Sequence, residues 1–132
     1  MTIENALVTL VTTDPALFAM IGDRFDPGTI PLKKKLPAAC YQVIGNTRTS
    51  TQDGPAGVAM PRFQITIDAK EVDEAKEVMR AMRKRLDGFV GNVGAVKIFV
   101  IVLENEYDGS NNLETGICTV RQDYKVSWSE TL

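Results

Sequence analysis

The alternation of hydrophobic and polar positions in residues 62–88 gives the clearest structural signal in the chain. From Phe63 to Ala69 an apolar residue occupies every second position, which is the period of a strand with one buried face. The apolar spacing then changes to three and four, the period of an amphipathic helix. Its apolar stripe consists of Val72, Ala75, Val78, Met79, Met82 and Leu86. Because both the strand and the helix have an apolar face to bury, we expect this unit to form the centre of the core.

Two helices are predicted before this unit. The first has one apolar stripe at helical spacing, formed by Ile3, Ala6, Leu7, Leu10 and Val11. The second begins at Asp14 and Pro15, a capping residue followed by a proline at the first helical position, and ends at Gly22.

Three further strands are predicted around the unit. Residues 38–44 form a short strand, and residues 96–103 (VKIFVIVL) are apolar enough to predict a strand buried on both faces. In residues 117–128 an apolar face that includes Gln122 alternates with a polar face that bears Arg121, Asp123 and Lys125. The polar face is expected to meet water or another protein.

Two polar segments between these strands are predicted to be loops. Residues 45–57 (GNTRTSTQDGPAG) and 104–116 (ENEYDGSNNLETG) hold few apolar residues and many turn formers. Loops of this length are uncommon in a compact domain and are usually functional or disordered, so we expect both to contact something outside the subunit. The acidic residues of 104–116 do not have the spacing of an EF-hand, and no metal site is predicted.

These elements follow the order ααββαββ. We therefore expect a single domain, residues 1–132, of class α+β: a two-layer sandwich with a mainly antiparallel four-stranded sheet and helices on one face.

Composition and charge favour protein partners over other ligands. The chain is 44% hydrophobic and 24% charged with a net charge of −2, whereas a dedicated nucleic-acid or anionic-membrane binder usually carries excess base. No apolar run approaches the roughly 20 residues of a membrane span, and Glu4 lies where a signal peptide has a basic residue. We expect the chain to fold in a cytoplasm.

The sequence offers little reactive chemistry. It has no histidine, the commonest general base and metal ligand. Cys40 and Cys118 lie in apolar, strand-like runs and are expected to be reduced, buried thiols. The phosphate-binding pattern GxxxxGK[ST] is missing. We therefore predict no enzyme, no catalytic residues, no cofactor and no metal.

The candidate functional residues are polar and charged side chains suited to protein contacts. They lie in a lysine run, in the two predicted loops and on the polar face of the last strand. The set is Lys33, Lys34, Lys35, Arg48, Asp53, Asp108, Asn111, Arg121, Asp123 and Lys125.

Several segments, in this order and spacing, resemble the tail-completion proteins of long-tailed phages and prophages, the group that includes tail terminators. They are ALFAMIGDRFDPGTIP, LPAACYQVIG, a polar stretch containing Asp53 and Gly54, and RFQITIDAKEVDEAKEVMRAMRKRLDG. The resemblance covers about residues 3–128. It departs from the family at Ala38, Ala39 and Cys40, where bulkier residues are usual.

The resemblance implies a structural virion protein without enzymatic activity. Members form rings, typically hexamers, that cap the end of the tail tube and provide the surface to which the head connector docks. The implied partners are copies of the chain, the major tail tube protein and the head–tail connector protein. No membrane contact and no specific nucleic-acid binding are implied, because the genome would only pass through the ring. The implied location is the virion tail or neck, after synthesis in the bacterial host cytoplasm.

Two other functions stay open at this point. One is another neck or adaptor component of the head–tail connector, and the other is a small-ligand or RNA-binding α+β domain. RNA-binding sheets expose aromatic residues beside basic ones. Here Phe63, Tyr124 and Trp128 are predicted to face the core.

Overall fold

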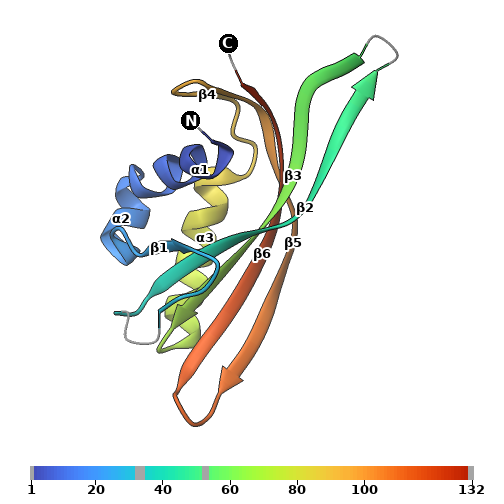
Figure 1. Cartoon of the computed structure of the whole chain (residues 1–132). Helices are drawn as coiled ribbons and strands as arrows, with labels where there is room; N and C mark the ends of the chain where they lie inside the picture. The colour runs from blue at the N-terminus through green and yellow to red at the C-terminus, as the bar shows by residue number, and fades with distance from the viewer. Residues whose placement is uncertain (1, 32–34, 52–53, 131–132) are drawn as a thin grey trace.

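In the computed structural model, three helices cover one face of a strongly curled six-stranded sheet (Figure 1). The structure describes residues 2–31, 35–51 and 54–130, with the backbone alone for residues 46–51, 54–59, 110, 112 and 130. The helices are α1 (Ile3–Thr12), α2 (Pro15–Ile21) and α3 (Val72–Leu86). The strands are β1 (Phe25–Pro27), β2 (Ala38–Thr51), β3 (Gly54–Ala69), β4 (Gly91–Val93), β5 (Val96–Asn112) and β6 (Ile117–Glu130).

The three predicted helices are confirmed, and local chemistry sets their ends. The Thr2 side chain accepts a hydrogen bond from the Asn5 backbone N–H at 3.1 Å, which caps α1. Asp14 caps α2 in the same way, accepting from Leu17 N–H at 3.1 Å. Gly22 follows α2 with a φ of 59°, a left-handed value that a glycine adopts without a Cβ clash. No helix in the described ranges is long and apolar enough to cross a membrane.

The predicted four-stranded, mainly antiparallel sheet is wrong, although the α+β class holds. The sheet is mixed, with strand order β1-β2-β3-β6-β5-β4, and β1 pairs in parallel with β2. The two strands that the sequence did not predict are each three residues long. Prolines and glycines around β1 obscured it in the sequence, and β4 forms a tight hairpin with β5. Such short strands have too few residues to show a period of two.

The predicted loops are also wrong, because most of residues 45–57 and 104–116 continue the strands. The β2–β3 ladder runs on to the pair Thr51 and Gly54, and the β5–β6 ladder runs on to Asn112 and Ile117. These two hairpins extend beyond the helices in roughly opposite directions (Figure 1). Residues 104–112 contact α3 through charged side chains, with Glu106 bonded to Arg83 and Asp108 paired with Lys76, so this part of β5 is polar and lacks alternation.

The core lies between α3, α1 and the covered face of β3, β6 and β5. Phe63, Ile65 and Ile67 of β3 are fully buried, as are Val78 and Met82 of α3, which confirms the predicted strand and helix unit. The expected burial of both faces of residues 96–103 is wrong. Ile98 and Ile101 are buried, but Phe99 and Val102 are 39% and 43% exposed, because the helices cover only one face.

The burial of the two cysteines differs. Cys40 of β2 is buried as predicted, whereas Cys118 of β6 is half-buried, and both are free thiols. Val72, which was assigned to the apolar stripe of α3, is 42% exposed at the first position of that helix.

Candidate assembly surface

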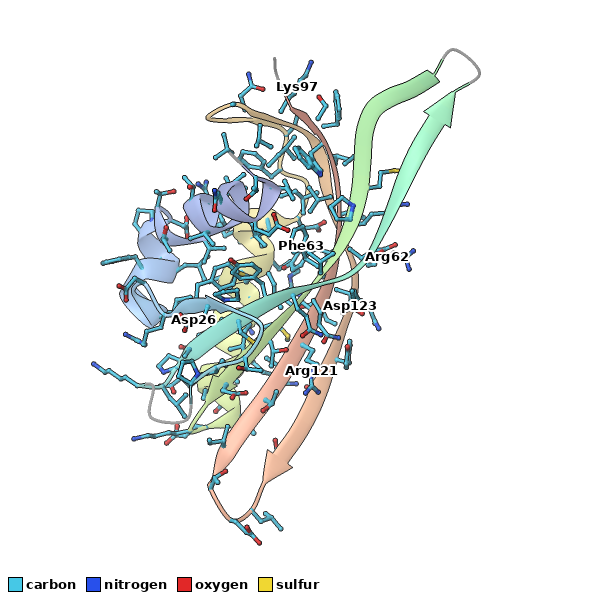
Figure 2. All side chains as sticks on the ribbon, viewed as in Figure 1. Asp26, Arg62, Phe63, Lys97, Arg121 and Asp123 are labelled. Atoms are coloured by element: carbon cyan, nitrogen blue, oxygen red, sulfur yellow. The ribbon has the colours of Figure 1, made fainter. Side chains whose placement is uncertain are left out.

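The sheet face that points away from the helices, called the open face below, carries a regular array of polar side chains. On its two central strands the register pairs Arg62 with Lys125, Gln64 with Asp123, Thr66 with Arg121 and Asp68 with Thr119. Residues directly opposite in an antiparallel pair point to the same side of the sheet. Figure 2 shows Arg62 pointing away from the helices while the adjacent Phe63 points toward them. The open face is therefore polar and of mixed charge.

Hydrogen bonds join these side chains across strands. The Gln64 amide donates to the Tyr107 hydroxyl at 2.5 Å and to Asp123 Oδ1 at 3.3 Å, so three strands are linked. The Thr119 hydroxyl donates to Asp68 Oδ1 at 2.7 Å. Because each bond fixes a side chain before any partner arrives, the open face presents an ordered polar surface.

One ion pair also crosses the open face from β3 to β5. Arg62 Nε of β3 lies 3.1 Å from Glu104 Oε1 of β5, with the two side chains 55% and 32% exposed. Solvent weakens a pair at this exposure, and its energy is at most about 1 kcal/mol. The pair therefore orients two long side chains on the open face more than it stabilises the fold.

A cavity of about 260 Å³ opens on this face between the segment after β1 and the central strands. Its lining includes Cys40, Gln42, Gln64, Asp68 and Arg121. Burial raises the pKa of the Cys40 thiol above its ordinary value, so the thiol is protonated and unreactive at neutral pH. The cavity has polar groups but no activated nucleophile.

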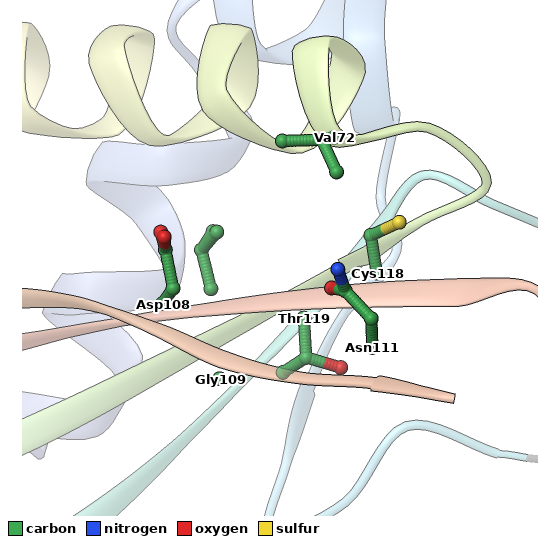
Figure 3. A pocket seen from close by; sticks show the side chains of 7 residues that line it. Val72, Asp108, Gly109, Asn111, Cys118 and Thr119 are labelled. Carbon is green, nitrogen blue, oxygen red and sulfur yellow. The ribbon is translucent and has the colours of Figure 1, made fainter. Parts of the chain in front are cut away.

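A second cavity, of about 280 Å³, lies where the start of α3 faces the β5–β6 hairpin. Figure 3 shows Val72 across from Asp108, Asn111 and Cys118. Asp108 Oδ1 lies 3.3 Å from Lys76 Nζ of α3, which ties this hairpin to the helix. In the part of the chain that the structure describes, no three His, Cys, Asp or Glu side chains are grouped to hold a metal.

The candidate residues predicted from sequence do not form one site. Arg121, Asp123 and Lys125 lie in a line on the open face, each half-buried. Asp108 and Asn111 lie instead at the second cavity.

The other candidates are separate from both groups or not described. Lys35 is exposed ahead of β2. Arg48 lies in β2 opposite Ala59, with its side chain outside the described atoms. Lys33, Lys34 and Asp53 lie outside the described residues.

A buried polar network between α3 and the sheet was not predicted. The fully buried Gln122 amide donates to the Met79 carbonyl at 3.0 Å and to Glu106 Oε2 at 2.9 Å. Arg83 Nη1 donates to the other oxygen of Glu106. A glutamine within an apolar strand face was a visible signal in the sequence, but its partner Glu106 had been assigned to a loop.

The chain matches one protein family along most of its length. The family model described as "Tail completion protein gp17" matches residues 5–124, from α1 to the middle of β6. No curated protein matches the sequence.

Comparison with solved structures supports the same fold. A chain of the "Virion of native gene transfer agent (GTA) particle" superimposes with a TM-score of 0.79. The alignment covers 96% of this chain and 93% of that chain, at 12% sequence identity. At that identity the match demonstrates a shared fold. Together with the family match, which confirms the resemblance noted in the sequence, it leads to one assignment: the chain belongs to the tail completion protein gp17 family, and it is a structural component of the virion tail or neck.

Proposed function

We propose that copies of this chain form a ring that caps the end of the tail tube and supplies the surface to which the head connector docks. The partners are then other copies of the chain, the major tail tube protein and the head–tail connector protein. The observation that carries the proposal is the pair of long hairpins that extend from a small, helix-covered body (Figure 1).

The lengths of β3 and α3 support a role for the β2–β3 hairpin outside the body of the subunit. At roughly 3.3 Å per residue, a strand of 16 residues such as β3 spans about 50 Å, while a helix of 15 residues such as α3 spans about 22 Å. About half of the strand length therefore extends beyond the helix that packs on it. The β2–β3 hairpin is then an arm that reaches a neighbouring subunit, and the turn of the β5–β6 hairpin, beside the start of α3, supplies a shorter contact.

The open face and the hairpins supply several small contacts in place of one tight site. Arg121, Asp123 and Lys125 would contact an adjacent molecule through the open face. Asp108 and Asn111 would do so from near the turn of the β5–β6 hairpin. In a ring each contact repeats once per subunit, so modest individual affinities add to a stable assembly.

The β2–β3 hairpin allows a direct test. Deleting residues 49–56 removes its end and leaves Arg48 and Ala59, which pair in the register, close enough for a short turn. Because this segment lies beyond the helix-covered core, we expect the variant to fold with a melting temperature within a few degrees of wild type. Electron micrographs of lysates should show unjoined heads and tails. A control variant replaces the eight residues with a Gly/Ser segment of equal length. It keeps the length of the hairpin and removes its side chains.

Wild-type numbers of joined particles from the deletion variant would contradict a docking role for this hairpin. Normal joining with the Gly/Ser segment, together with failure of the deletion, would show that length and not side-chain identity is needed.

A further inference from the structure

Two basic side chains on the open face have no acidic partner in the part of the chain that the structure describes. Arg121 and Lys125 of β6 are half-buried, and neither side chain forms an ion pair or a hydrogen bond there. By contrast, the open-face acids Asp68, Asp123 and Glu104 each have a partner within the chain. A charged group that is partly removed from water is stabilised by a group of opposite charge. These two bases are therefore suited to an acid from outside the chain.

Arg121 is the better placed of the two bases, because it lines the cavity of about 260 Å³ on the open face. The amide of Gln42 and the hydroxyl of Thr29 line the same cavity and can also donate hydrogen bonds. Pockets for drug-sized ligands usually have volumes of about 300–1,000 Å³. The smaller cavity suits a single side chain.

A glycine on the neighbouring strand leaves room for the Arg121 side chain. A Cβ at position 109 would lie 2.9 Å from Arg121 Nη1, so this end of the guanidinium lies against the backbone of β5 at Gly109. A side chain that is restricted in this way before binding loses less conformational entropy when it binds.

Asp68 lines the same cavity and opposes an acidic ligand. Burial is the main cause of the raised pKa of the Cys40 thiol, which also lines the cavity; Asp68 raises this pKa further and Arg121 lowers it. Both charges therefore act in the cavity. The Thr119 hydroxyl donates to Asp68 Oδ1 at 2.7 Å and offsets part of the carboxylate charge. Arg121 and Asp68 should thus affect an acidic partner in opposite directions.

A different protein is a better source of this acid than the open face of a second copy. In each copy Asp68, Asp123 and Glu104 already have partners, so a face-to-face contact between copies would supply Arg121 only with acids that must first give up a bond.

We infer that Arg121 binds the carboxylate of an Asp or Glu side chain of a different virion protein, one that docks on the open face. This inference rests on the proposed docking function and names the chemistry of the partner. An arginine donates two parallel N–H bonds to a carboxylate, which gives the contact a defined geometry.

Three variants test the sign of each charge when they are purified and added to a lysate that lacks the functional chain. Arg121→Gln should need at least roughly tenfold more protein than wild type for half-maximal head–tail joining, and Arg121→Glu should need still more. Asp68→Asn keeps an acceptor for Thr119 and should need the same amount of protein or less. The matched control, Arg80→Gln, removes an exposed positive charge from α3 and should differ from wild type by less than about twofold.

Thermal unfolding shows whether Arg121 acts on the partner or on the fold. Because Arg121 has no acceptor in the described part of the chain, Arg121→Gln should keep the melting temperature within a few degrees of wild type. A large decrease would show a structural role and overturn the inference.

Selection for second-site changes that restore joining by Arg121→Glu then identifies the partner. We expect an Asp or Glu of a second virion protein to change to Lys or Arg. The same change should impair joining by the wild-type chain, as one exchanged charge pair requires. Wild-type joining by Arg121→Glu, or restoring changes that lie only in this chain, would overturn the inference.

The deletion of residues 49–56 keeps this inference separate from the proposed function. Failure of the deletion together with normal joining by Arg121→Glu would reject the Arg121 contact and leave the docking role intact. Normal joining by the deletion together with the charge exchange would reject the docking hairpin and leave the Arg121 contact intact.

Discussion

Tyr124 is the largest of the fully buried side chains, and its hydroxyl has no hydrogen-bond partner within the described residues. Burial raises the pKa of this phenol far above its ordinary value, and the nearby charges of Glu106 and Asp87 act in the same direction. A buried hydroxyl without a partner costs about 1–3 kcal/mol. The ring of Tyr124 therefore stabilises the core while its hydroxyl group weakens it.

Tyr124→Phe should leave the free energy of unfolding at pH 7 unchanged or raise it by about 1 kcal/mol. The folded-state pKa of Tyr124 is raised, so its contribution is complete below the unfolded pKa of about 10 and decreases as the pH rises above that value. The phenylalanine variant should lose less stability between pH 9 and 11, as urea unfolding at each pH would measure. A loss above about 1 kcal/mol at pH 7 would show that the hydroxyl is hydrogen-bonded.

Gly109 and Gly45 give a matched pair of glycines in long strands. A Cβ at position 109 would lie 3.0 Å from the Thr119 carbonyl oxygen and 2.9 Å from Arg121 Nη1, whereas a Cβ at position 45 would meet nothing within 4 Å. We expect Gly109→Ala to destabilise the fold by about 1–3 kcal/mol and Gly45→Ala by less than about 0.5 kcal/mol. Equal effects in thermal unfolding would contradict the close approach of β5 to β6 at this point.

At the scale of elements, α3 is fixed to the sheet by both apolar and polar contacts. Its buried stripe, formed by Ala75, Val78, Met82 and Leu86, packs on the covered face of the sheet. Beside the stripe, Arg83 of α3 bonds to Glu106 of β5, and Glu106 accepts from Gln122 of β6. The polar network specifies where along the two strands the helix lies, which apolar contacts alone define less sharply.

Arg83→Met should lower the free energy of unfolding by about 1 kcal/mol, because Glu106 would keep its charge in a largely buried position with Gln122 as its remaining partner. The side chains of Arg83 and Glu106 are 42% and 21% exposed, so solvent screening reduces the cost below that of a fully buried pair. Arg80→Met, at an exposed position on the same helix, is the control and should change stability by less than about 0.5 kcal/mol. Equal urea midpoints for the two variants would contradict the structural role of the network.

The elements that could be predicted from sequence are those with one face against the helices. In residues 62–69 and 117–128 the alternation is enforced by burial, so strand, face and partner helix follow from the pattern. Residues 104–112 contact α3 through the polar side chains of Glu106 and Asp108, and residues 45–57 hold few apolar residues, so both strand segments have the composition of loops. The ladder of backbone hydrogen bonds that holds them does not depend on side-chain polarity, which is why the sequence does not reveal it.

The candidate surface was predictable to a similar extent. Arg121, Asp123 and Lys125 were placed on the uncovered face of β6 from alternation alone, and the structure places them there. The hydrogen bonds that link Asp123 to Gln64 and Gln64 to Tyr107 depend on β6 lying between β3 and β5. Strand order involves pairings between distant residues, and no local pattern encodes it.

At the scale of the whole molecule, the chain is a small core with two hairpins and a polar open face. Each of these features is suited to contact with another protein. The fold is shared with a chain of a gene transfer agent virion, and the family is that of a tail completion protein. We therefore expect these surfaces to be covered when copies of the chain assemble in the virion.

Cryo-electron microscopy of complete particles at the junction of head and tail tests this most directly. We expect a closed ring of copies on the head-proximal end of the tail tube. Copies found along the tube, at its distal end or as isolated monomers would contradict it.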